Sequence, residues 1–155
     1  MKRIHISADI MTAEEAGLFL VSALLVSHGV RIDTEAWVRV GDVWLVARGN
    51  NIRQLRPDPV SADAWVRAAI YKGRASRLGV KLLKPDHTPP PGPCVGPMGE
   101  ISVVDMVRAR LGGTMVLWYG RDCREAGFQV DELKVWLMPA LANVILDRIE
   151  AGLPT

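Results

Sequence analysis

Metal-binding residue types are scarce in this sequence, whose 155 residues include two cysteines and three histidines. Cys94 and Cys123 lack the C-x-x-C spacing typical of zinc sites. His5 and His87 have no neighbours that suggest a metal site. We therefore expect no bound metal. The cysteine count leaves a single disulfide open, but a reduced chain in the cytoplasm is the favoured interpretation.

Long apolar runs are absent as well. The longest one, AGLFLVSALLV at residues 16–26, is about half as long as a membrane-spanning helix. The N-terminal stretch MKRIHISADIMTAEE turns polar and acidic too early for a signal peptide. With 49% apolar and 23% charged residues, the composition is that of an ordinary globular protein, and the length suits one domain over residues 1–155. We expect no membrane contact and a cytoplasmic location.

Familiar catalytic and nucleotide-binding strings are missing. No G-x-G-x-x-G follows the first predicted strand, and G-x-x-x-x-G-K-[ST] occurs nowhere. The strings H-E-x-x-H and G-x-S-x-G are absent too. The sequence therefore argues against the dinucleotide-binding, P-loop, zinc-protease and hydrolase classes that carry these motifs.

Acidic residues are absent between Arg67 and Lys84, although the net charge of the whole chain is only +2. A stretch of one sign attracts phosphate backbones, because binding releases counterions. It predicts an RNA contact, and the open alternative is a solvated surface whose acidic partners lie elsewhere in the fold. The predicted RNA-binding residues are Arg67, Lys72, Arg74, Arg77, Lys81 and Lys84.

Hydropathy and turn residues predict alternating strands and helices in the first half. Thr12 and Glu15 form a capping box that opens the first helix, and Gly29 suits the position just after its end. Ser61 is expected to cap the second helix. The predicted elements are a strand at 2–8, the first helix, two strands within 35–48 joined at Gly41-Asp42, a helix at 62–74 and a strand at 79–83.

A proline-rich segment at 84–99 interrupts this pattern. It predicts an extended surface connection, with a proline-rich docking ligand as the alternative. The elements expected after it are a helix at 100–112, a strand at 114–120, a loop at 121–127, a short strand near 128–130 and a helix at 131–152 that Pro139 should kink or break. The fold class is therefore α/β, a mostly parallel sheet with helices on both faces, and ligands are expected at the carboxyl ends of its strands.

Residues 22–70 resemble a known family. SHGVRID at 27–33 is similar to the Ser-His-Gly-[Ile/Val]-Arg-x-Asp string of the archaeal tRNA pseudouridine N1-methyltransferases, which belong to the SPOUT superfamily. IRQLRPDPVSADAWV at 52–66 resembles their Leu-x-Pro-Asp-x-x-Ser segment. VLWYG at 116–120 falls where the family has a Val-Leu-Gly-Asp strand end, but YGRDCREAG at 119–127 replaces the family's Gly-Asp-His-x-Gly loop.

The resemblance implies a C-terminal trefoil knot, S-adenosylmethionine as the cofactor, an RNA substrate such as tRNA, and a homodimer. Gly120 would let backbone approach the adenosyl group closely. The other expectation for these residues is that they are core positions at a strand end. The implied cofactor-binding residues are Leu117, Trp118, Tyr119, Gly120, Leu133 and Val135.

Arg31 and Asp33 are the implied catalytic residues. The guanidinium of Arg31 suits a phosphate or the target base. Asp33 would accept the N1 proton of pseudouridine as the methyl group transfers. The alternative is an Arg31–Asp33 surface pair after the first helix. For the whole chain, the rival hypothesis is a SPOUT-like module that has lost its cofactor loop and only holds RNA or a partner protein.

Overall fold

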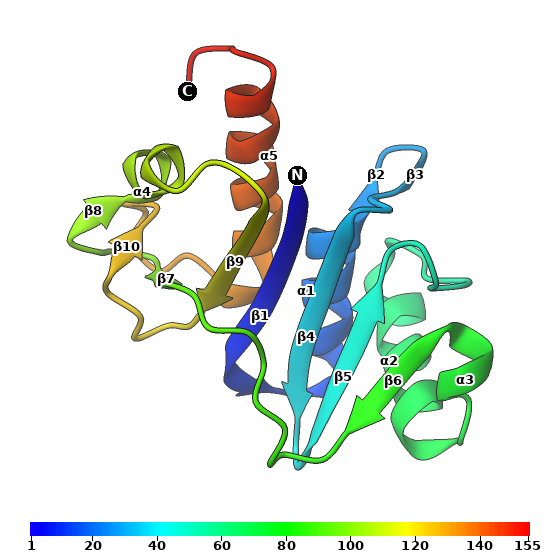
Figure 1. The fold of residues 1–155 in the computed structure, drawn as a ribbon. Coiled ribbons are helices and arrows are strands. Elements are labelled where there is room, and N and C mark those ends of the chain that lie inside the picture. The colour runs from blue at the N-terminus through cyan, green and yellow to red at the C-terminus, as the bar shows by residue number, and fades with distance from the viewer.

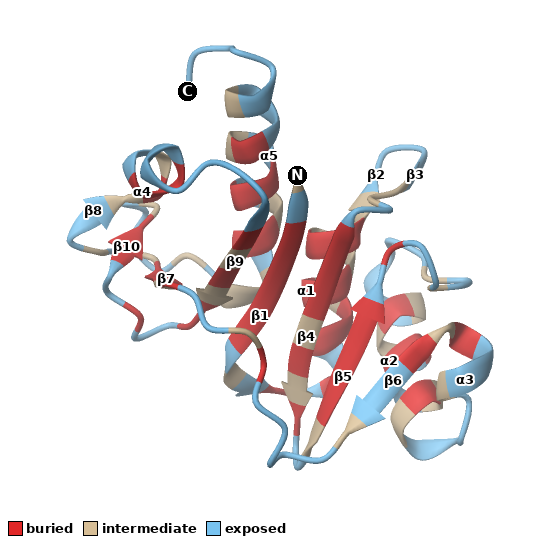
Figure 2. Cartoon of the chain, in the orientation of Figure 1, coloured by how far each residue is buried: buried red, intermediate tan, exposed pale blue.

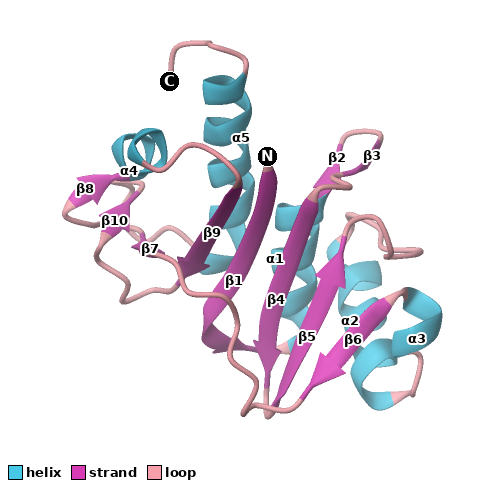
Figure 3. Cartoon of the chain, viewed as in Figure 1, coloured by secondary structure: helices cyan, strands magenta, loops and turns pink.

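An eight-stranded sheet forms the centre of the molecule (Figures 1 and 3). The computed structural model describes all residues, 1–155. Across the sheet the strands follow the order β6-β5-β4-β1-β9-β7-β10-β8, and only the pairs β4–β5 and β5–β6 are antiparallel. The predicted α/β class with a mostly parallel sheet is confirmed. The strands are β1 (Lys2–Met11), β4 (Thr34–Val40), β5 (Val43–Arg48), β6 (Val80–Leu83), β7 (Cys94–Gly96), β8 (Ile101–Ser102), β9 (Thr114–Tyr119) and β10 (Ala126–Gly127).

The helices pack on one face of this sheet. They are α1 (Ala13–Leu24), α2 (Pro59–Tyr71), the short α3 (Ala75–Leu78), α4 (Val103–Ala109) and α5 (Met138–Glu150) with the 3-10 turn η1 (Val135–Leu137) before it. Their apolar side chains and the sheet face beneath them form one cluster of 28 buried residues, and the central strands are buried along most of their length (Figure 2). A second cluster, Ile4, Ile6, Trp44 and Val46, lies on the opposite face and contains strand residues only. The prediction of helices on both faces is therefore wrong.

The proline-rich segment covers part of that second face, where it crosses from β6 to β7 (Figure 1). The Trp118 indole N–H donates to the carbonyl of Pro90 at 2.9 Å, and the backbone N–H of Trp118 donates to Pro93 at 3.0 Å. Pro89 and Pro93 are buried, while His87 is exposed. The predicted extended connection is confirmed for residues 84–93, which contain no helix or strand. Residues 94–96 of the same segment instead form β7, a strand inside the sheet between β9 and β10.

The ends of the helices differ from the sequence prediction. The capping box of Thr12 and Glu15 is present, with hydrogen bonds of 3.0 and 3.1 Å, so the start of α1 is confirmed. The helix nevertheless ends at Leu24, before the predicted Gly29, because residues 25–30 form a small hairpin, β2 (Leu25–Val26) with β3 (Gly29–Val30). The cap of α2 is Asp58, not Ser61. Its carboxylate accepts the N–H of Ser61, and Pro59 fits the first turn because no N–H is needed there.

The C-terminal elements are shorter than predicted. Residues 131–134 are not helical, and Pro139 lies in the first turn of α5, where it neither kinks nor breaks the helix. Residues 101–102 form β8, so α4 begins only at Val103, after its cap Ser102. The strand expected near 128–130 lies two residues earlier, as β10, and Gln129 has a φ of +60° that ends it.

The position of β10 could not be read from the sequence. It lies between β7 and β8, two strands that follow each other in the chain, and it is parallel to both. The backbones there are so close that a Cβ on Gly99 would collide with Ala126, and one on Gly127 would collide with Met98 and Gly99. Only glycine fits at these two positions.

Candidate functional site

A cleft with a volume of about 1070 Å³ lies at the carboxyl ends of β1 and β9. This is the edge of a parallel sheet at which ligands are expected. Four segments form its walls: the end of β1 with the start of α1, the β7–β8 loop, the β9–β10 loop, and the segment before α5. The lining residues are Ala8, Asp9, Ile10, Met11, Glu15, Pro97, Met98, Arg121, Asp122, Arg124, Asp131, Glu132, Leu133, Lys134, Val135 and Trp136.

The cleft carries more negative than positive charge, although the whole chain has a net charge of +2. Five carboxylates line it, against three cationic side chains. Apolar side chains, among them Leu133, Val135 and Trp136, form the rest of the surface. The combination suits a small ligand with an apolar ring and a cationic group.

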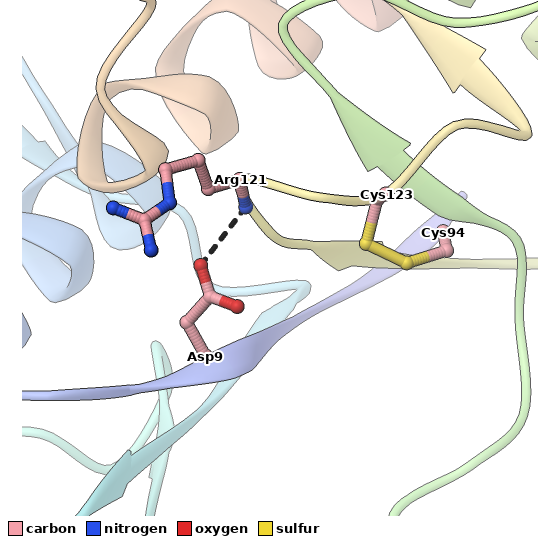
Figure 4. Close-up of a disulfide and its surroundings, with 4 residues drawn as sticks. All are labelled: Asp9, Cys94, Arg121 and Cys123. Carbon is pink, nitrogen blue, oxygen red and sulfur yellow. Dashed lines mark hydrogen bonds between the residues drawn. A yellow bond between two sulfur atoms is a disulfide. The ribbon is translucent and has the colours of Figure 1, made fainter.

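Asp9 is the carboxylate of the cleft with the clearest structural role (Figure 4). It lies within the irregular stretch of β1 between Ile6 and Ile10, where the pairing with β4 shifts register. Its carboxylate accepts the backbone N–H of Arg121 at 2.9 Å, so it ties β1 to the β9–β10 loop. The sequence analysis missed this residue. A signal was present, because Asp9 directly follows the predicted strand at 2–8, at the edge of the sheet where ligands bind.

The six residues predicted to bind the cofactor are divided by the structure. Leu133 and Val135 line the cleft. Gly120 lies beside the cleft, because a Cβ atom added to it would be 3.2 Å from Oδ1 of Asp9. Leu117 and Tyr119 are fully buried among the helices, and Trp118 points to the opposite face, where its ring packs edge-on against Trp44. The side chains of Leu117 and Tyr119 are therefore core residues, and that of Trp118 is partly buried against the second cluster. None of these three side chains lines the cleft.

Tyr119 belongs to a buried polar network with His5 and Asn143. The Asn143 amide donates to the carbonyl of Ala23 at 2.9 Å, so its oxygen faces His5 Nε2, at 3.0 Å. Nε2 therefore carries the imidazole proton, and the Tyr119 hydroxyl donates to Nδ1 at 2.6 Å. Burial lowers the pKa of His5 to about 3, although the hydrogen bond to Asn143 acts to raise it. Burial raises the pKa of Tyr119 well above its ordinary value. Both side chains are neutral at physiological pH and have no access to the cleft.

Arg31 and Asp33 lie at the other end of the sheet. The carbonyl of Asp33 accepts a hydrogen bond from the N–H of Arg3, near the start of β1. Asp9 of the cleft comes six residues later in the same strand, which corresponds to about 20 Å along it. Asp33 is exposed and lines a separate hollow of about 450 Å³ with Lys2, Thr34 and Arg48, among others. Within one chain, neither predicted catalytic residue lines the cleft.

The Arg31–Asp33 surface pair is not formed either. Arg31 instead makes an ion pair with Asp147 of α5, and Arg3 approaches the same carboxylate at 2.8 Å. Burial disfavours the charge on Asp147, but the hydrogen bonds and charges of Arg31 and Arg3 outweigh it and lower the pKa of this carboxyl. The pair therefore fastens the end of the β2–β3 hairpin to α5.

The predicted RNA-binding residues extend from α2 through α3 to the segment after β6. Arg67 pairs with Asp63 at 3.0 Å on α2. Two neighbouring hollows, of about 570 and 530 Å³, hold three of the others, together with three arginines that the sequence analysis missed. The cationic residues that line them are Arg48, Arg53 and Lys81 in one hollow, and Arg56, Arg74 and Arg77 in the other.

No carboxylate lines either of these two hollows. One acidic partner does lie nearby, because Glu35 accepts a hydrogen bond from Arg48. Of the six predicted RNA-binding residues, only Arg67 has an acidic partner, as the open alternative expects. Lys72, Arg74, Arg77, Lys81 and Lys84 form no ion pair, and neither do the neighbouring Arg53 and Arg56.

Cys94 and Cys123 form a disulfide, with their Cα atoms 5.1 Å apart (Figure 4). The favoured expectation of a reduced chain is therefore wrong for this structure. The sequence could not decide the point, because the two cysteines are 29 residues apart and meet only when the β9–β10 loop folds against β7.

The structure contains no group of three or more histidine, cysteine or acidic side chains placed to hold a metal ion. None of its helices has the length and apolar character required to span a bilayer. In comparisons with known proteins, no protein-family model matches the chain and no curated protein is significantly similar to it.

Proposed function

We propose that this protein is an S-adenosylmethionine-dependent RNA methyltransferase with a SPOUT-like fold, as its resemblance to the tRNA pseudouridine N1-methyltransferases implies. The observation that carries the proposal is the cleft at the carboxyl ends of β1 and β9. Its walls include the loops on either side of β10, the strand inserted between β7 and β8. A tRNA substrate implies a cytoplasmic protein.

The inserted strand also supports the trefoil knot. After β10, the chain passes directly beside Met98 and Gly99 of the β7–β8 loop and then continues into α5. Threading requires a segment that passes between two strands that are consecutive in the chain. Here β10 lies between β7 and β8, and the chain then continues into α5. We propose that residues 128–155 pass through the loop that follows TMVLWYG, the predicted strand at 114–120.

The cleft residues fit the cofactor. S-adenosylmethionine carries a sulfonium and an ammonium group, which the five carboxylates would attract, and a carboxylate, for which the three cationic side chains are available. Leu133, Val135 and Trp136 offer an apolar wall for its adenine ring. When bound, the cofactor supplies the methyl group. The role of this chain is to hold it, with Asp9 keeping the Arg121 backbone in place beside Gly120.

The two basic hollows support RNA as the substrate. Six cationic side chains line them, and none of these residues lines the acidic cleft, so the surface proposed for phosphates is separate from the one proposed for the cofactor. Phosphate contacts of this kind position the nucleic acid without reading its sequence.

An apolar stripe on η1 and α5 supports a homodimer. Leu137 at the end of η1 and Leu141 and Val144 of α5 are 40%, 39% and 51% exposed, and their spacing places them on one side. Leu18, Val21 and Leu25 of the neighbouring α1 region are partly exposed as well. In a symmetric dimer through this surface, Arg31 and Asp33 would serve the partner's cleft, since they do not reach the cleft of their own chain.

Calorimetric titration with S-adenosylmethionine and its demethylated product tests the proposal. We expect saturable binding of both, with Asp33→Asn leaving cofactor affinity unchanged and slowing only methyl transfer, because a base acts on the substrate. The absence of binding at millimolar ligand would reject the enzyme. The non-catalytic RNA- or protein-binding module would then be the function to retain.

A further inference from the structure

The β9–β10 loop, residues 120–125, forms one wall of the cleft through Arg121, Asp122 and Arg124. Cys123 lies between two of these residues. It is 8% exposed, and it is the only buried residue from 121 to 125, all the others being exposed and charged. The loop therefore has no apolar side chain other than Cys123 with which to hold itself against the sheet.

Hydrogen bonds fasten the loop near its two ends. The N–H of Gly120 donates to Val95 at 3.0 Å, and the N–H of Arg121 donates to Asp9. At the other end, the N–H of Glu100 donates to the carbonyl of Arg124 at 3.0 Å.

The tip of the loop has a different attachment. The N–H of Cys123 donates to Gly120, within the loop itself. No hydrogen bond joins Asp122 or Cys123 to another element, so the disulfide to Cys94 of β7 is the one bond that fastens the tip to the sheet (Figure 4).

The packing around this bond leaves the loop little freedom while the disulfide is present. A Cβ on Gly96 would collide with the carbonyl of Cys123, and one on Gly120 would lie 2.9 Å from the Cys123 sulfur. The loop is thus in close contact with β7 on one side. Any movement after cleavage of the disulfide has to lead away from β7, and it would displace Asp122 and Arg124 in the cleft wall.

We propose that the Cys94–Cys123 disulfide is a redox-controlled clamp on the cleft: the oxidised protein holds the β9–β10 loop in its ligand-binding position, and reduction releases the tip of the loop and weakens binding. This inference rests on the proposed function for the identity of the ligand and for the cytoplasmic location. Disulfides in cytoplasmic proteins are usually transient or redox-sensing, so the proposed location suits a reversible bond.

The chemical step is thiol–disulfide exchange with a protein or small-molecule dithiol. Cys94 is half-buried and more accessible than Cys123, so the attacking thiolate reaches the Cys94 sulfur first and releases Cys123 as a thiolate, which takes up a proton. The second thiol of the reductant then displaces Cys94 from the mixed disulfide. The protein gains two electrons and two protons, and the dithiol becomes a disulfide.

Amide hydrogen exchange, followed by mass spectrometry on the full chain, tests the clamp without any ligand. In protein reduced with dithiothreitol, we expect the peptide covering residues 120–125 to exchange about tenfold faster than in oxidised protein. A peptide from the β4–β5 hairpin should be unchanged. The double variant Cys94→Ser/Cys123→Ser is the matched control. It should exchange as the reduced protein does, with or without dithiothreitol.

Titration of S-adenosylhomocysteine into the same samples adds the binding readout, for which we expect about tenfold weaker affinity after reduction. Equal exchange in both redox states, or free thiols in protein held in mildly oxidising buffer, would overturn the clamp. Redox-dependent exchange without ligand binding in either state would support the clamp and reject the proposed function. Tight binding in both redox states, together with equal exchange, would reject the clamp and support the proposed function.

Discussion

Asp147 accepts two hydrogen bonds from the Arg31 guanidinium, at 3.1 and 3.0 Å, and so joins the end of the β2–β3 hairpin to α5. The family resemblance assigns Arg31 to RNA or to the target base. In the folded chain, the guanidinium of Arg31 is paired with the carboxylate of Asp147, which also forms an ion pair with Arg3. A role for Arg31 in binding RNA would require it to exchange Asp147 for a phosphate.

The first prediction concerns this ion pair. Asp147→Asn should lower the free energy of unfolding by about 1–2 kcal/mol, because it removes the partner of one buried and one partly buried arginine. The Asp147 side chain is 46% exposed, so solvent screening keeps the loss below that of a fully buried pair. Urea unfolding at neutral pH measures it. Asp33→Asn, a change in an exposed carboxylate without an ion pair, is the control and should stay within about 0.5 kcal/mol.

The effect of Asp147→Asn should depend on pH. The folded-state pKa of Asp147 is lowered, so its contribution is complete above the ordinary value of 3.8 and is lost as the pH falls below that value. The two proteins should therefore approach each other in stability in strong acid. A difference that grew on acidification would contradict the assigned ion pair.

His5 should remain neutral far below the ordinary histidine range. Its folded pKa is about 3 and the unfolded value is 6.5, so between these values the unfolded chain binds one more proton than the folded one. Stability due to His5 is complete above pH 6.5 and falls by up to about 1.4 kcal/mol per pH unit on acidification. Heteronuclear NMR of the imidazole follows the titration directly. A midpoint near 6.5 would mean that the ring is not buried as described.

Tyr119→Phe tests the hydrogen bond between the Tyr119 hydroxyl and His5 in the same network. The variant keeps the ring but leaves His5 Nδ1 buried without a donor, which should cost about 1–2 kcal/mol of unfolding free energy. Tyr71→Phe is the matched control, since Tyr71 is 66% exposed and should be nearly neutral. Equal effects in the two variants would argue against the hydrogen bond between Tyr119 and His5.

Gly120→Ala tests the wall of the cleft. The added methyl group would lie 2.9 Å from the Cys123 sulfur, 3.1 Å from Ala8 Cβ and 3.2 Å from Asp9 Oδ1, so the β9–β10 loop has to shift. We expect about tenfold weaker binding of S-adenosylhomocysteine by calorimetry, and a loss of about 1–3 kcal/mol in stability. Gly29→Ala adds the same methyl group where the nearest atom is 4.0 Å away, and it should leave both quantities unchanged.

Salt dependence tests the basic hollows. Arg77→Ala together with Lys81→Ala removes one cation from each hollow and should reduce the slope of log K against log salt by about 1.4–1.8 for a tRNA probe. The control pair, Arg108→Ala with Arg110→Ala, makes the same charge change at α4, outside both hollows. Equal slopes for the two double variants would return Arg77 and Lys81 to ordinary surface residues.

Several elements were predictable because short-range interactions define them. The capping box places the start of α1 through hydrogen bonds between Thr12 and Glu15, three residues apart. Gly41, with a φ of +57°, turns the chain between β4 and β5, and the flanking alternation places their residues on the two faces. Residues 85–93 of the proline-rich segment, with five prolines, could form neither a helix nor a central strand in any context. These features follow from the sequence by itself.

Other features depended on residues that meet only in three dimensions. The end of α1 moved from Gly29 to Leu24 because a hairpin and the Arg31–Asp147 pair compete with the local cap. The cleft combines segments up to 128 residues apart, from Ala8 to Trp136, and no local pattern specifies their proximity. The insertion of β10 between β7 and β8, which brings Cys123 to Cys94, arises from long-range strand pairing and backbone contact at two glycines. Sequence periodicity reports which side of an element is apolar, but the partner that covers it is chosen by the free energy of the whole packed chain.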